Sequence, residues 1–204
     1  KLISLLSFGV VLGMGFQAWL GATVVYSVLA PVKITTHMLM ALAIVAALIL
    51  IIQKANPRIE RTKYMANFHK AISYLLFIFL LQIVFGTQVR EFVDHQLDLG
   101  LTKDNWLLNP SIIFYVHRSF SILPLGIAVY LFWINKRNEL GFASTKPLLA
   151  GMIIAAFSGM AMYYIDFPLG TQPIHLVIAA ILFGQIFYIF LQSRKAKNNI
   201  SKTK

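Results

Sequence analysis

Residues 114–120 read FYVHRSF and place a histidine beside an arginine inside a long apolar run. Ionisable side chains are costly within a membrane-spanning helix, so each needs a specific reason to be there. Two further apolar runs contain a histidine in the same way, ITTHMLMAL at residues 34–42 and QPIHLVIAA at residues 172–180. An explanation for His117 should therefore also account for His37 and His175.

The composition places the chain in a lipid bilayer. Of its 204 residues 58% are hydrophobic and only 12% are charged, and the mean hydropathy is +0.74. Such a chain has too little polar surface for a water-soluble domain. Its net charge of +11 resides between the apolar runs and in the tail RKAKNNISKTK, which favours anionic lipid rather than nucleic acid as a partner. The absence of cysteine excludes disulfides and thiolate metal sites from this sequence.

Six apolar runs are long enough to cross a hydrocarbon layer of about 30 Å at about 1.5 Å per helical residue. They predict an all-α integral membrane protein, with spans near residues 2–30, 34–53, 66–87, 111–135, 147–165 and 171–193.

The basic residues predict the orientation of these spans. They gather in every second connection and in the tail: Lys54, Arg58, Arg61 and Lys63, then Lys136, Arg137 and Lys146, then Arg194, Lys195, Lys197, Lys202 and Lys204. By the positive-inside rule, Lys1 and the tail are cytoplasmic in a plasma or inner membrane, and the 88–110 loop faces outward. Because the sequence starts on Lys1 and enters an apolar run at once, we expect an N-terminal part to be missing.

The orientation gives three histidines a common position. His37, His117 and His175 each fall in the first turns of a helix that runs from outside to inside, so we expect them at one depth near the outer face. His69 lies at a cytoplasmic helix start and His95 in the outer loop, where both are interpreted as ordinary interfacial residues.

The three histidines also mark a repeat of helix, outer turn and His-bearing helix. The helix before each turn carries related polar or small residues, in QAWLGATVV (17–25), QIVFGTQVRE (82–91) and, more faintly, FSGMAMYY (157–164). The predicted architecture is one complete four-helix bundle plus half of a second, pseudo-symmetric bundle. Its parts are residues 1–53, a cytoplasmic linker at 54–65, the bundle at 66–193 and the tail at 194–204.

Matched depth is what axial ligation of a haem iron requires, because two imidazoles must approach one metal from opposite faces of a flat ring. His117 and His175 are the better pair, since both belong to the last four helices. His37 then lacks a partner in this sequence. The alternative is that each histidine only forms a hydrogen bond with a neighbouring helix.

Two arginines could bind the haem propionates, which are anionic and prefer the wet end of such a site. Arg118 adjoins His117, and Arg90 follows the third span in GTQVRE. The alternative for Arg90 is an interfacial anchor paired with Glu91 or Asp94.

Four stretches resemble the haem A synthase family of cytochrome oxidase assembly: QAWLGATVVYSVLAPVKITTHMLMAL, LQIVFGTQVREFVD, NPSIIFYVHRSFSIL and MYYIDFPLGTQPIHLVIAAILFGQ. Family members have eight spans in two four-helix halves, and the six spans here resemble the third to eighth. The resemblance implies that His117 and His175 hold the iron of haem b and that His37 lies at the site of the substrate haem O. It also implies oxidation of a methyl group of haem O to a formyl group, giving haem A.

The resemblance also implies what this sequence lacks. The glutamate taken to be catalytic belongs to the first two spans, so no catalytic residue is predicted here, and the segment alone should not complete the reaction. Haem O synthase is a candidate partner; the electron acceptor is open, as is homo-oligomerisation. Two rival functions are a b-type electron-transfer cytochrome and a small transporter whose histidines relay protons.

The predicted outer loop has a pattern of its own. Phe92, Val93, Leu97 and Trp106 suggest a cap on the membrane surface, although interfacial aromatic residues alone would give the same pattern.

Overall fold

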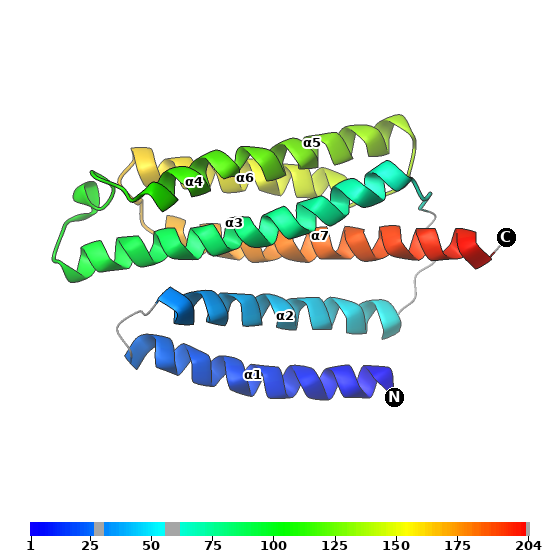
Figure 1. Cartoon of the computed structure of the whole chain (residues 1–204), viewed down its shortest axis with the longest axis horizontal. Coiled ribbons are helices and arrows are strands. Elements are labelled where there is room, and N and C mark those ends of the chain that lie inside the picture. The colour runs from blue at the N-terminus through cyan, green and yellow to red at the C-terminus, as the bar shows by residue number, and fades with distance from the viewer. Residues whose placement is uncertain (27–30, 56–61, 203–204) are drawn as a thin grey trace. The chain divides into compact units, whose positions relative to one another are not determined.

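The computed structural model describes residues 1–26, 31–55 and 62–202 (Figure 1). Within these ranges the chain is helical and contains no strand. The elements are α1 (Leu2–Tyr26), α2 (Pro31–Ala55), α3 (Ala66–Asp98), the short 3₁₀ helix η1 (Lys103–Asn105), α4 (Ile112–Phe120), α5 (Ile122–Arg137), α6 (Thr145–Tyr164) and α7 (Thr171–Lys202).

Within the described ranges, six helical spans are long and apolar enough to cross a membrane, which confirms the predicted all-α membrane fold. The fourth span, Ile112–Arg137, consists of α4 and α5. Pro124 explains the irregularity at Ser121, because proline has no N–H for the carbonyl of Phe120 and its ring crowds that carbonyl.

α3 extends well past the predicted end of its span near residue 87. The segment expected as the start of an outer loop continues as helix to Asp98, since no glycine or proline interrupts it and Arg90 pairs with Asp94 one turn later. The helix stops at Gly100, whose φ of +76° is the left-handed conformation that glycine adopts freely. The N–H groups of Leu101 and Gly100 donate to the carbonyls of Gln96 and Leu97, which completes a Schellman cap.

The chain forms two compact units, residues 1–58 with 84–115 and residues 59–83 with 116–204. In the first unit α1 and α2 run side by side in opposite directions (Figure 1). Gly13 permits this contact, since a Cβ there would lie 3.1 Å from Met40 Cε. Thr35 of α2 forms hydrogen bonds with Thr87 (2.7 Å) and Gln88 (3.1 Å) of α3. Hydroxyl and amide groups therefore fasten α2 to α3 within a largely apolar unit.

The second unit is built from the first part of α3 together with α4 to α7. Its core consists of aliphatic and aromatic side chains that are 0–1% exposed: Phe68, Ile72, Leu75, Leu131, Phe142, Leu148, Leu182, Ile186 and Ile189. Many other apolar side chains of the spans are exposed, as expected of surfaces that face lipid. The predicted division into residues 1–53, 66–193 and 194–204 stays a prediction, and residues 56–61 of the predicted linker lie outside the described residues.

A tight connection fixes the end of the second unit where α3 begins and α5 ends. The side-chain nitrogen of Asn135 donates to the carbonyl of Phe142, and its oxygen accepts from the Phe142 N–H; both hydrogen bonds are 3.0 Å long. The N–H of Lys63 donates to the carbonyl of Leu140 (2.9 Å), and Phe68 stacks on Phe142. The start of α3 and the end of α5 are thereby held together.

Candidate functional site

Two of the three predicted histidines meet a glutamine from the preceding span in the same manner. The amide nitrogen of Gln17 lies 3.2 Å from His37 Nε2 and 3.1 Å from the His37 carbonyl oxygen. That of Gln82 lies 3.2 Å from His117 Nδ1 and 3.0 Å from the His117 carbonyl oxygen. One amide thus holds both the ring and the backbone of each histidine, so the sequence repeat has a structural counterpart in each unit.

His175 has a serine in the corresponding place. Ser158 Oγ of α6 lies 2.7 Å from His175 Nδ1 of α7, and it donates its own hydrogen to the carbonyl of Ala155 (2.9 Å). Because that hydrogen is used, the hydroxyl oxygen accepts from the Nδ1–H of His175. The neutral ring therefore keeps its free lone pair on Nε2, the atom that a metal would bind.

The contact of Gln82 with His117 favours the other protonation of the ring, with the hydrogen on Nε2. An amide nitrogen only donates, so His117 Nδ1 accepts from Gln82 and the proton of the neutral ring sits on Nε2. The amide oxygen of Gln82 is buried and, within the described part of the chain, has no hydrogen-bond partner. An exchange of the two amide atoms would set that oxygen against the His117 carbonyl oxygen, which is also an acceptor, so both contacts favour the amide nitrogen at this place.

His37 differs again, because the ring nitrogen that Gln17 contacts is Nε2 rather than Nδ1. Its Nδ1 is buried, and no group in the described ranges pairs with it. The ring lies against α1, where a Cβ on Gly21 would stand 3.2 Å from His37 Cε1. A Cβ on Gly159 would likewise stand 3.6 Å from His175 Cε1, so small residues seat both rings close to a neighbouring helix.

The predicted pair His117 and His175 belongs to one compact unit, whereas His37 belongs to the other. In the described part of the chain no three histidine, aspartate or glutamate side chains gather as they would around a structural metal ion. That His117 and His175 hold a haem iron between them stays a prediction.

Arg118 lies against two aromatic rings at the end of α6. Its guanidinium carbon is 5.3 Å from the ring centre of Tyr163 and 5.9 Å from that of Tyr164, and Nη2 donates to the Tyr164 hydroxyl (3.1 Å). Arg118 is exposed, so its remaining N–H groups can reach an anion.

Arg90 is engaged by a carboxylate on its own helix. Its Nη2 and Nε lie 2.7 and 2.9 Å from the two oxygens of Asp94, which is 5% exposed in its side chain against 47% for the arginine. This is the pairing anticipated for an interfacial anchor. A role of Arg90 at a propionate stays a prediction.

Two local arrangements were not predicted from the sequence. His69, interpreted as an ordinary interfacial residue, has its Nδ1 3.1 Å from the oxygen of the buried Ser193 and its ring stacked on Phe190. In the first unit a cavity of about 390 Å³ has a mixed polar and apolar lining: Gln88, Glu91, Phe92 and His95 of α3 together with Ser111 and Ile113. The spacing of Glu91 and His95, one helical turn apart, was the available signal.

A family model described as cytochrome oxidase assembly protein, COX15-CtaA, matches residues 1–187. No curated protein and no solved structure matches the chain.

Proposed function

Because this chain belongs to the cytochrome oxidase assembly family COX15-CtaA, the haem A synthase family, we propose that it is a membrane oxidoreductase that converts haem O to haem A. The reaction oxidises one ring methyl group to a formyl group. The family assignment carries the role in cytochrome oxidase assembly, and the six apolar helices fit a multi-pass membrane protein. The roles proposed for the three histidines rest on their hydrogen bonds.

His117 and His175 would hold the iron of haem b. The single observation that supports this best is the Ser158 hydrogen bond, which leaves His175 with a free lone pair on Nε2. A metal-bound histidine commonly donates its second ring N–H to a protein acceptor, and Ser158 is such an acceptor. When bound, the haem supplies one-electron redox chemistry; the protein positions it and tunes it through its ligands and nearby charges.

His37 would face the substrate haem O. Its unit contains Gln17, which orients the ring from α1, and Gly21, which lets the ring approach the helix backbone. The buried, unpaired Nδ1 supports a role in binding, since a buried polar atom without a partner in the protein is costly unless a ligand satisfies it. No catalytic acid or base is assigned to this chain.

Arg118 and Arg90 would neutralise propionates at the edge of a haem. Arg118 has the better support, because its guanidinium is held by Tyr163 and Tyr164 and the residue stays exposed. In this proposal the protein lies in the plasma or inner membrane with its basic connections on the cytoplasmic side. It would receive haem O from haem O synthase and deliver electrons to an acceptor of the same membrane.

Optical spectra of histidine variants test the ligand assignment. His117→Ala and His175→Ala should each abolish or grossly alter the reduced-minus-oxidised spectrum of haem b, while His37→Ala should leave it intact and impair only the conversion. If His37 proves as necessary for the spectrum as the other two, the pairing is wrong. Haem A formed from added haem O by the protein as expressed in its host separates a synthase from an electron-transfer cytochrome. A purified protein with no chromophore would instead favour a proton-relaying transporter.

A further inference from the structure

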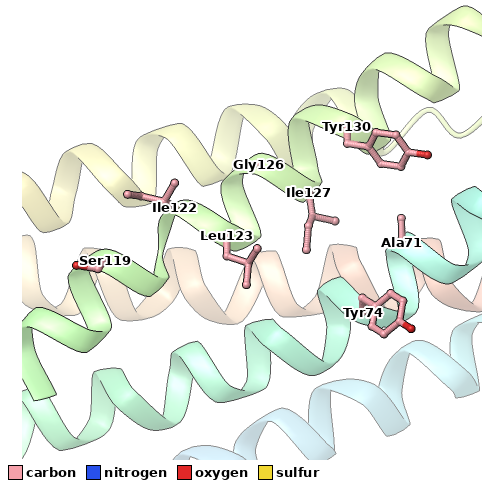
Figure 2. Close-up of a pocket in the computed structure, with 8 residues that line it drawn as sticks. All are labelled: Ala71, Tyr74, Ser119, Ile122, Leu123, Gly126, Ile127 and Tyr130. Carbon is pink, nitrogen blue, oxygen red and sulfur yellow. The ribbon is translucent and has the colours of Figure 1, made fainter.

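An apolar groove runs along the second unit between α3 and the α4–α5 span, and no histidine lines it (Figure 2). Its volume is about 570 Å³, within the usual range of roughly 300–1,000 Å³ for small-molecule sites. Ala71 and Tyr74 line it from α3, and Ser119, Ile122, Gly126 and Tyr130 line it from α4 and α5. In Figure 2 the two tyrosines lie toward one end of the groove and Ser119 toward the other.

Gly126 leaves the floor of this groove open. A Cβ at that position would meet no atom within 4 Å, although the residue sits in the interior of a helix. The neighbouring Ile122 is 71% exposed, so the groove lies on a surface of a membrane span rather than in the core. An empty groove in hydrocarbon would forfeit dispersion contacts along its whole length, so a chain-like apolar group should fill it.

Beyond the tyrosine end of the groove, aromatic and basic side chains follow one another along α5. The Tyr130 ring lies 6.5 Å from that of Trp133, and the guanidinium carbon of Arg137 lies 5.0 Å from the Trp133 ring centre. Lys70 precedes the lining residue Ala71 on α3, and the start of α3 is held to the end of α5 by the Lys63–Leu140 hydrogen bond. Both cations therefore stand at the same end.

These cations are available for an anion. Among the described residues neither Lys70 nor Arg137 forms an ion pair with a carboxylate; Glu139 is the acidic residue of the connection that follows α5. Tyrosine and tryptophan beside lysine and arginine are the usual composition of a span where it meets lipid headgroups. A guanidinium binds phosphate oxygens in a bidentate manner and with charge assistance.

We propose that this groove binds an anionic phospholipid. One acyl chain lies along Ile122 and Gly126 between the two helices, and the phosphate is bound by Arg137 and Lys70 beyond the tyrosines. The charge favours a lipid over a helix from a second copy, because a chain with a net charge of +11 would bring further cations to this end. In the predicted orientation Lys70 and Arg137 lie at the cytoplasmic leaflet, which contains anionic lipids.

Native mass spectrometry of the full-length chain tests this site. Protein stripped of lipid in mild detergent is titrated with phosphatidylglycerol or with phosphatidylcholine of the same acyl chains. Phosphatidylglycerol should bind more tightly, and Arg137→Gln and Lys70→Gln should each weaken it by roughly five-fold, the value expected for one cation near an anionic lipid. Gly126→Leu should abolish binding of the lipid, because the leucine side chain would occupy the open floor of the groove where the acyl chain lies.

Gly15→Leu is the matched control, since Gly15 also lies within a span and a Cβ there also meets nothing within 4 Å, but it belongs to α1 of the other unit. It should bind phosphatidylglycerol as the parent protein does. If Gly126→Leu binds phosphatidylglycerol as tightly as the parent protein does, the groove is not the site. If the parent protein binds phosphatidylcholine as tightly as phosphatidylglycerol, the preference for an anionic headgroup is wrong. If Gly126→Leu changes the oligomeric state and leaves lipid binding unchanged, the occupant is a second copy and the proposal fails.

Discussion

Ser158 and His175 form the shortest polar contact made by any of the three predicted histidines, 2.7 Å from Oγ to Nδ1. Since Ser158 also donates to Ala155, the hydroxyl accepts from the ring, and His175 presents an unprotonated Nε2 before any metal arrives. The glutamine contacts of His37 and His117 do not have this consequence. Of the three rings His175 is therefore the one whose hydrogen bond leaves Nε2 free.

Replacement of Ser158 by alanine should weaken the haem b site without removing a ligand. Loss of the acceptor makes the His175 ring a poorer electron donor, so haem affinity should fall by roughly 10–100-fold and the midpoint potential should rise. Haem titration followed by absorption and redox potentiometry measure the two effects. Ser158→Thr keeps a hydroxyl and should restore both values. An unchanged potential in Ser158→Ala would show that the serine only packs against the ring.

The two glutamines offer a paired comparison. Gln82→Leu removes the side chain that holds both the ring and the carbonyl of His117, so the haem-to-protein ratio of the purified protein should fall by roughly tenfold or more. Gln17→Leu makes the same change beside His37, in the other unit, and should leave the haem b band intact. Equal loss of haem b in both variants would contradict the assignment of His37 to a separate substrate site.

The sequence predicted the six spans because each is a long apolar run bounded by charged or turn-forming residues. It did not predict the length of α3, since the polar segment after Gly86 resembles a loop in composition. Only the structure shows that Arg90 and Asp94 pair along one helix face and that Val93 is buried, 3% exposed. VREFVD contains opposite charges one helical turn apart, but the same residues also fit an interfacial loop.

The sequence singled out the three histidines, whose role as haem ligands stays a prediction, but it did not indicate the partners that set their protonation. The spacing of Gln17 with Gly21 and of Gln82 with Gly86 made the repeat visible, and the structure places both glutamines against the expected histidines. Ser158 breaks that spacing because Gly159 follows it directly, so it stood out only weakly. Which ring nitrogen each partner contacts depends on the rotation of neighbouring helices, and no sequence spacing determines that rotation.

Arg118 and Arg90 should differ in their effect on haem. Arg118→Ala should shift the midpoint potential of haem b downward, because the loss of a nearby positive charge favours the oxidised iron. Arg90→Ala should have a smaller effect, since that guanidinium is already paired with Asp94. Redox potentiometry at two salt concentrations distinguishes the charge effect, which salt screens, from a structural one. If neither variant changes affinity or potential, both arginines are topology anchors.

Gly151 should be needed for the close contact of α6 with α7. A Cβ there would lie 2.8 Å from Cδ2 of Leu182, a side chain that is 1% exposed, so Gly151→Ala forces a buried residue to move. Overpacking of this kind costs about 1–3 kcal/mol of stability. Gly126→Ala is the control, because it gains the same helix propensity, about 1 kcal/mol, and its Cβ meets no atom within 4 Å. The midpoint of thermal unfolding in detergent should therefore be lower for Gly151→Ala than for Gly126→Ala. Equal midpoints would mean that Leu182 yields without cost and that the glycine is not required for the packing of these two helices.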